Sequence, residues 1–194
     1  PPRLLHSMFG LHEGTTLYIL TKLWLCGMMA FLCGRAIGLR SPAARFLSVG
    51  WMLASYNLIW CNWSLPDVSP WLPVLFLGVE RILSRRYRTG FFAIAFGGTL
   101  LLLSGHPETA FTMGLGLGFY FLCRLIYERR RWAEASHAIG VCASGWALAI
   151  TVSAAQILPF LEYLVHSSTF LERVEQPKLT SLPAGTVAAL WIHR

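Results

Sequence analysis

The chain has 194 residues, of which 55% are hydrophobic and only 13% are charged, whereas a soluble domain of this length carries about a quarter charged residues. With a mean hydropathy of +0.55, this composition excludes an ordinary soluble domain and predicts an all-α integral membrane protein. The formal charge of +7 does not indicate nucleic-acid binding, because the basic residues form separate clusters between apolar runs and not one continuous patch.

Six apolar runs predict a polytopic helical bundle over residues 1–165. A hydrocarbon core of roughly 30 Å needs about 20 helical residues at ~1.5 Å per residue, and the first run comes close to that length. Pro70 is compatible with the start of the third helix, because the first helical turn needs no amide donor. The predicted spans are 15–33, 46–61, 70–83, 90–103, 109–127 and 138–158, the last continuing past a bend at Pro159, and residues 166–194 begin an extracytoplasmic loop or domain.

Basic residues occur in every second turn between these spans. The turns at 62–70 and 104–108 contain no lysine or arginine. Because basic turns stay on the cytoplasmic side, the alternation predicts that both ends of the chain and the hairpin at 104–108 are extracytoplasmic. The basic clusters, after the first, third and fifth spans, are Arg35, Arg40 and Arg45; Arg81, Arg85, Arg86 and Arg88; and Arg124, Arg129, Arg130 and Arg131.

The chain begins with Pro1 instead of methionine and lacks a secretory signal pattern. We therefore expect it to be an internal part of a longer membrane protein.

The segment SGHPET at 104–109 places a histidine and a carboxylate between two uncharged runs. Gly105, Pro107 and Glu108 are typical of helix ends, but helix-end chemistry does not account for His106. The fourth span is only ~21 Å long, which would leave this turn below the outer surface. The pattern predicts a recessed pair of His106 and Glu108 in a catalytic or proton-handling site, with helix capping as the alternative.

Three more charged residues are candidates for a site on the outward face. Lys22 lies about 10 Å into the first span, where it either snorkels to the surface or faces the bundle interior and holds an anionic headgroup or a carboxylate such as Glu108. Asp67, the only aspartate, either caps the third helix or acts as a catalytic acid. Glu162 either lines the outward cavity or is an ordinary interfacial carboxylate.

The remaining patterns indicate packing. The five cysteines lie in or beside apolar runs without a Cys-x-x-Cys pair, which favours buried thiols over a disulfide framework or a zinc site. We predict no cofactor; a divalent metal ion could assist, although no ligand cluster in the sequence requires one. Gly114 and Gly118 have the spacing of a close contact between two helices.

Three motifs follow one another in an order that resembles a known family. They are Trp71-Leu72-Pro73 with Glu80-Arg81, then LSGHPETA at 103–110, and then AAQILP at 154–159 with Glu162. In this order they resemble the bacterial YfhO membrane-protein family, and the segment from Ser181-Leu182-Pro183 is similar to the start of that family's large outer loop. Members are regarded as polytopic glycosyltransferases of the C-type architecture.

The resemblance implies transfer of a sugar from a polyprenyl-phosphate carrier to a cell-envelope polymer, such as a teichoic acid, at the outer face of the bacterial cytoplasmic membrane. A carboxylate would take the proton of the acceptor hydroxyl, and cations would stabilise the departing phosphate. We therefore expect Glu108 and then Asp67 as the acidic residues, and His106, Lys22 and Arg3 on the phosphate side.

C-type transferases generally place a catalytic acid in the first outer loop, and the resemblance begins just beyond that loop. The family's usual general base is therefore expected upstream of this chain. A transporter and a non-catalytic assembly scaffold are the alternatives, although the sequence shows no internal repeat of the kind many transporters have.

Overall fold

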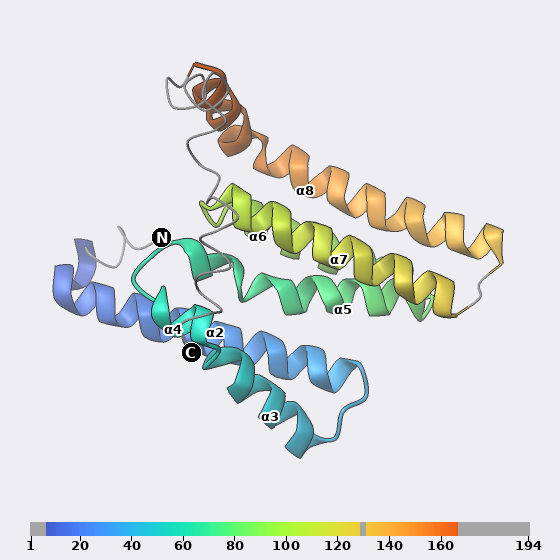
Figure 1. The fold of residues 1–194 in the computed structure, drawn as a ribbon, viewed down its shortest axis with the longest axis horizontal. Coiled ribbons are helices and arrows are strands. Elements are labelled where there is room, and N and C mark those ends of the chain that lie inside the picture. The colour runs from blue at the N-terminus through green and yellow to red at the C-terminus, as the bar shows by residue number, and fades with distance from the viewer. Residues whose placement is uncertain (1–6, 129–130, 167–194) are drawn as a thin grey trace, which may run out of the picture. The chain divides into compact units, whose positions relative to one another are not determined.

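The computed structural model describes residues 7–128 and 131–166, and its regular structure over these residues is entirely helical (Figure 1). The chain divides into two compact units, residues 1–154 and 155–194, so the boundary falls within the last helix. Apart from His166, the predicted extracytoplasmic region lies outside the described residues. The helices are α2 (Leu11–Ala36), α3 (Ser41–Met52), α4 (Ser55–Ile59), the 3-10 helix η1 (Leu65–Val68), α5 (Trp71–Leu83), α6 (Tyr87–Leu102), α7 (Pro107–Tyr127) and α8 (Trp132–His166).

Three helices in the described part of the chain, α2, α7 and α8, are long and apolar enough to cross a membrane. The entirely helical structure of the described residues confirms the predicted all-α class, and these three helices support the membrane assignment. Helix α8 continues through Pro159, so the predicted sixth span is part of one longer helix. Helices α5, α6 and α7 lie within three residues of their predicted bounds.

The predicted second span, 46–61, is wrong as a single helix. Helix α3 ends at Met52, and the short helix α4 follows after a turn. The Asn57 side chain donates a 2.7 Å hydrogen bond to the Trp51 carbonyl oxygen, which at the end of α3 otherwise accepts only a long 3.4 Å hydrogen bond from the Ala54 backbone N–H. With 12 residues, α3 is ~18 Å long, which is short for a crossing.

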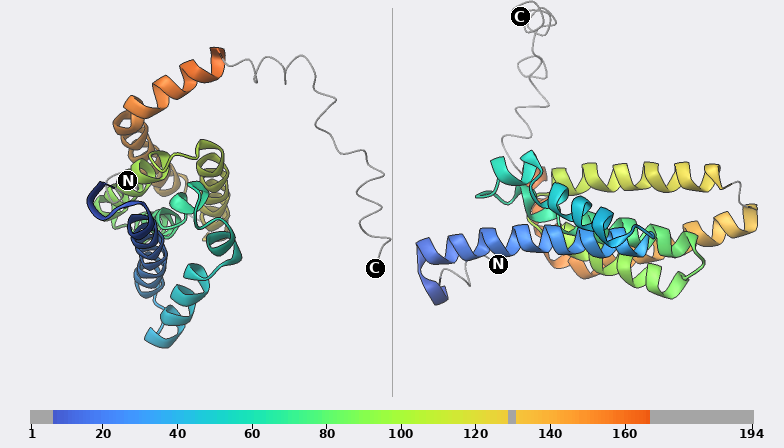
Figure 2. Two further views of the ribbon diagram at one scale, coloured as in Figure 1. Left: turned by 90° about the vertical axis from the view of Figure 1, so that its left-hand side faces the viewer. Right: turned by 90° about the horizontal axis from the view of Figure 1, so that it is seen from below.

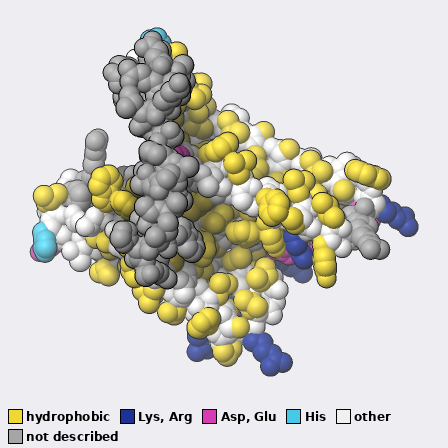
Figure 3. Space-filling model, in the orientation of Figure 1, with side chains coloured by type: hydrophobic (Ala, Val, Ile, Leu, Met, Phe, Trp, Pro, Cys, Tyr) yellow, Lys and Arg dark blue, Asp and Glu magenta, His cyan; other side chains and the backbone are white. Residues whose placement is uncertain are grey.

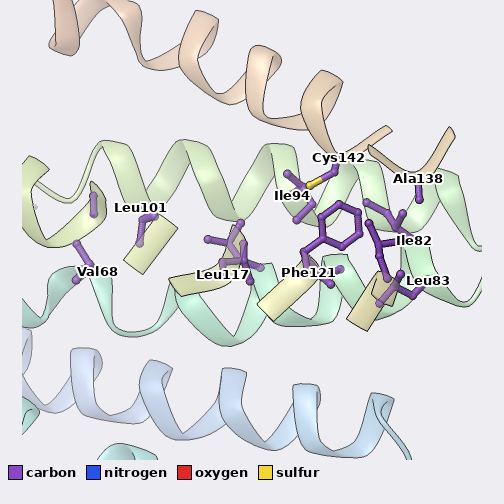
Figure 4. Packing of buried hydrophobic residues seen from close by; sticks show 13 residues of the cluster. Val68, Ile82, Leu83, Ile94, Leu101, Leu117, Phe121, Ala138 and Cys142 are labelled. Atoms are coloured by element: carbon purple, nitrogen blue, oxygen red, sulfur yellow. The ribbon is translucent and has the colours of Figure 1, made fainter. Parts of the chain in front are cut away.

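Helices α5 and α6 pack closely because glycines stand where they meet. A methyl group on Gly90 would lie 2.5 Å from Ile82 Cγ1 and 2.9 Å from the Gly78 carbonyl oxygen, and one on Gly78 would lie 2.8 Å from Ile94 Cδ1. Ile82 and Ile94 are fully buried in the core between these helices (Figure 4). The absence of side chains at the two glycines therefore sets the distance between α5 and α6.

The part of α8 in the first unit packs on α6 in the same manner. A methyl group on Gly145 would lie 2.9 Å from Ile94 Cγ2, and one on Gly98 would lie 3.0 Å from Ala149 Cβ. The predicted close contact at Gly114 and Gly118 is wrong. A methyl group on Gly114 would only approach the ring of Trp146, at 3.9 Å, and one on Gly118 would have no atom of the described residues within 4 Å.

The basic turns lie together at one end of the first unit, as the views in Figures 1 and 2 show. Arg85 Nη2 lies 2.8 Å from Glu134 Oε1, which joins the turn after α5 to the start of α8. Ile37, after α2, lines a pocket together with Arg81 and Arg86. Figure 3 shows the dark blue lysine and arginine side chains toward this end. The alternation along the sequence of basic turns with turns that lack lysine and arginine thus corresponds to a clustering of the basic turns at one end of the first unit.

Candidate functional site

Lys22 is the only charged residue among the buried residues of the described chain, with 5% of its surface exposed. Its Nζ lies 2.8 Å from Asp67 Oδ1 and donates to the Trp63 carbonyl oxygen at 3.0 Å and to the Tyr18 hydroxyl at 3.3 Å. The Tyr18 hydroxyl in turn donates to the Asp67 carboxylate. Since an ammonium group has three protons, all donors of Lys22 are engaged within the protein.

Two local features place these side chains. Tyr18 and Lys22 are four residues apart on α2 and so share one face of the helix, with Nζ 4.4 Å from the centre of the Tyr18 ring. Asp67 lies in η1, which is anchored by the fully buried Val68 and by a 2.8 Å hydrogen bond from the Tyr56 hydroxyl to the Leu65 carbonyl oxygen. The carboxylate therefore has a fixed position opposite α2.

A cavity of about 500 Å³ lies beside this ion pair. Its lining combines the ion pair and other polar side chains with apolar residues, a combination that suits a ligand with a polar head and a hydrocarbon part. The polar lining residues are Tyr18, Thr21, Lys22, Asp67 and Ser104, and the others are Leu25, Pro70, Trp71, Leu100 and Leu103.

The structure corrects two sequence-based interpretations. Lys22 faces the interior and does not snorkel to the surface, but its carboxylate partner is Asp67 and not Glu108. Asp67 does not cap the third helix, because α5 begins at Trp71 without a side-chain cap; its carboxylate is turned toward α2 instead. The sequence did not predict a contact between these two residues.

His106 is the N-terminal cap of α7. Its Nδ1 accepts a hydrogen bond from the Thr109 backbone N–H at 3.3 Å and lies 2.7 Å from Thr109 Oγ1, while Gly105 before it adopts φ +86°. Helix-end chemistry therefore does account for this histidine. Glu108 is exposed in the first turn of α7. Neither His106 nor Glu108 lines the cavity, although the adjacent Ser104 does.

Substitution of His106 separates capping from catalysis. We expect His106→Ala to lower the free energy of unfolding by about 1 kcal/mol, because α7 loses its cap. His106→Asn should keep most of the stability of the unmutated protein, because asparagine is a favoured cap. Thermal unfolding in detergent measures the difference. If activity is lost in both variants while stability is lost only in the alanine variant, the imidazole has a chemical role beyond capping.

The other two predicted site residues are Arg3 and Glu162. Arg3 lies outside the described residues. Glu162 is an exposed residue of the second unit, where its carbonyl oxygen lies 2.9 Å from His166 Nδ1. Within the described ranges, no group of three or more histidine, cysteine, aspartate or glutamate residues is placed to hold a metal ion.

Sequence reasoning missed Tyr18 and a second polar cluster at the basic end. There Glu80 Oε2 lies 3.1 Å from Arg124 Nη2, and the Tyr120 hydroxyl donates to Glu80 Oε1. The signal that could have found both clusters is a tyrosine four residues before a cation on a long apolar helix.

No protein-family model matches this chain, and no curated protein or solved structure is significantly similar to it. The fold and the site therefore define the class: an all-α membrane protein in which a buried lysine pairs with a partly buried aspartate beside an amphiphilic cavity.

Proposed function

We propose that this chain is part of a membrane-embedded glycosyltransferase that moves a sugar from a polyprenyl-phosphate carrier to a hydroxyl group of a cell-envelope polymer. The observation that carries the proposal is the Asp67 carboxylate, which a buried lysine holds at the wall of an amphiphilic cavity. The order of the motifs at 71–81, 103–110 and 154–162, which resembles the YfhO family, supports the same reaction class.

In this proposal the protein crosses the bacterial cytoplasmic membrane six times, with both ends extracytoplasmic. The position of the three basic turns at one end of the first unit supports this orientation, because such turns remain in the cytoplasm. Helices α3, α5 and α6 are shorter than the average hydrocarbon core, so in this proposal the bilayer is locally thinned around them. The cavity beside Asp67 would then face the outer leaflet, where a flipped carrier presents its sugar.

Asp67 is the proposed general base. The acceptor oxygen forms a bond to the anomeric carbon, its proton passes to the carboxylate, and the bond from the anomeric carbon to the phosphate oxygen breaks with its electron pair on the phosphate. A carboxylate has about four acceptor positions, so Asp67 can accept the substrate hydroxyl in addition to Tyr18 and Lys22. The apolar wall at Trp71 and Leu103 would take the first units of the polyprenyl chain.

Lys22 has a different role in this proposal from the one expected from the sequence. Because its three donors are already engaged, it positions Asp67 instead of binding the carrier phosphate. The hydroxyl groups of Thr21 and Ser104 line the same cavity. They donate to the Leu17 and Leu101 carbonyl oxygens, so each would have to exchange that partner to donate to the phosphate.

The test is sugar transfer by the full-length protein in detergent or liposomes with polyprenyl-phosphate sugar donors. We expect Asp67→Asn to lower the rate by about 100-fold or more, the contribution of a positioned general base, and the matched control Glu108→Gln to leave it within about threefold, because Glu108 does not line the cavity. Unchanged transfer by Asp67→Asn would exclude Asp67 as the base. Uptake of substrate without transfer would favour a transporter.

A further inference from the structure

At the basic end of the first unit, an apolar slot continues into a basic pocket. The slot has a volume of about 230 Å³ and is lined by Ala30, Cys33, Ile37, Leu47, Trp51, Pro73, Phe76, Glu80 and Tyr120. The basic pocket has a volume of about 290 Å³ and is lined by Ala36, Ile37, Glu80, Arg81, Ser84 and Arg86. Because Ile37 and Glu80 line both, the two cavities adjoin at these residues.

Glu80 at the junction does not make the pocket acidic. Its carboxylate faces α7, where it accepts a hydrogen bond from Tyr120 and pairs with Arg124 at 3.1 Å. Arg81 and Arg86, in contrast, form none of the ion pairs found among the described residues. The pocket therefore presents two guanidinium groups whose charge the described protein does not neutralise.

The turn after α5 brings these two arginines to the same pocket. The Arg86 backbone N–H donates to the Arg81 carbonyl oxygen at 2.8 Å, and Arg85 between them adopts φ +59°. This six-residue closure of a helix end normally has glycine at the left-handed position, and a longer side chain there is strained. The strained turn folds the chain so that Arg86 lies beside the last turn of α5.

We propose that the slot and the basic pocket together bind one anionic phospholipid of the membrane leaflet at the basic end. Its phosphate would lie between Arg81 and Arg86, since guanidinium groups match phosphate oxygens in geometry and charge, and one acyl chain would occupy the slot. Apart from Glu80 and Tyr120, the slot is lined by apolar residues, so an inorganic phosphate would leave it unfilled. This site is separate from the proposed transferase cavity and does not depend on it.

Native mass spectrometry of the full-length protein in detergent, titrated with phosphatidylglycerol, tests the headgroup contact. We expect Arg81→Gln/Arg86→Gln to weaken binding of one lipid by about tenfold to thirtyfold. The control Arg85→Gln/Arg88→Gln removes the same charge from residues that do not line the pocket, and we expect a change under about threefold. Phosphatidylcholine should bind weakly to all forms. If both double variants lost phosphatidylglycerol affinity equally, the proposal would be overturned, because the lipid would then be attracted by the total charge of the basic end and not by this pocket.

A photoactivatable phosphatidylglycerol, with a diazirine on one acyl chain, tests the slot in the unmutated protein and so does not depend on the folding of any variant. We expect cross-links at residues 30–37 and 47–51, which unlabelled phosphatidylglycerol abolishes and inorganic phosphate at the same concentration does not. Cross-links distributed over the other apolar surfaces, or full competition by inorganic phosphate, would show that no lipid chain occupies the slot.

Discussion

Replacing Lys22 with methionine is expected to lower the free energy of unfolding by about 3 kcal/mol. Removing one partner of a buried ion pair leaves the other charge without compensation, at a typical cost of about 3–5 kcal/mol. The lower end of that range applies, because Lys22 is 5% exposed but Asp67 is 21% exposed. Methionine keeps the length of the side chain, so the loss reports mainly the missing charge and its hydrogen bonds.

The double variant Lys22→Met/Asp67→Asn distinguishes this explanation from simple loss of packing. Because it removes both charges, we expect it to be more stable than Lys22→Met alone, as measured by reversible denaturant titration in mild detergent. Arg85→Gln is the control: it breaks an exposed pair, with side chains 67% and 35% exposed, and should cost under about 1 kcal/mol. A double variant less stable than both single variants would contradict the assignment of Asp67 as the partner.

Substitution of Gly90 with alanine should also destabilise the protein, by about 3 kcal/mol. A methyl group there would lie 2.9 Å from two backbone atoms, the Gly78 carbonyl oxygen and the Ile82 nitrogen, which no change of side-chain conformation can relieve. Helices α5 and α6 must therefore separate, and overpacking of this kind costs about 1–3 kcal/mol or more. The same denaturant titration measures the loss.

Gly116→Ala is the matched control for Gly90→Ala. Gly116 is also in a helix, but within the described part of the chain no atom would lie within 4 Å of the new methyl group. We expect a gain of about 0.5–1 kcal/mol, because alanine is the better helix former. If Gly90→Ala were as stable as Gly116→Ala, the close packing of α5 and α6 would not contribute to the fold.

The two polar clusters are built alike at opposite ends of α5. In each, a tyrosine and a cation four residues apart on a long helix hold one carboxylate: Tyr18 and Lys22 of α2 hold Asp67, just before α5, and Tyr120 and Arg124 of α7 hold Glu80 within it. Both long helices are candidate membrane spans. The short helix α5 is thus fixed between two spans by polar contacts, which accounts for a stable position despite its ~20 Å length.

The sequence by itself determined the all-α class, the apolar runs of most helices and the alternation of basic turns, because hydropathy, helix periodicity and charge are properties of neighbouring residues. It did not determine the break after Met52, where the Asn57 side chain donates to the Trp51 carbonyl oxygen. It also did not determine the partner of Lys22. That partner, Asp67, lies in η1, far along the chain. It is 49 residues from Tyr18, the other residue of α2 that contacts it. Only the tertiary structure decides which distant polar groups share a buried space, because each must find compensation wherever the packing of the helices places it.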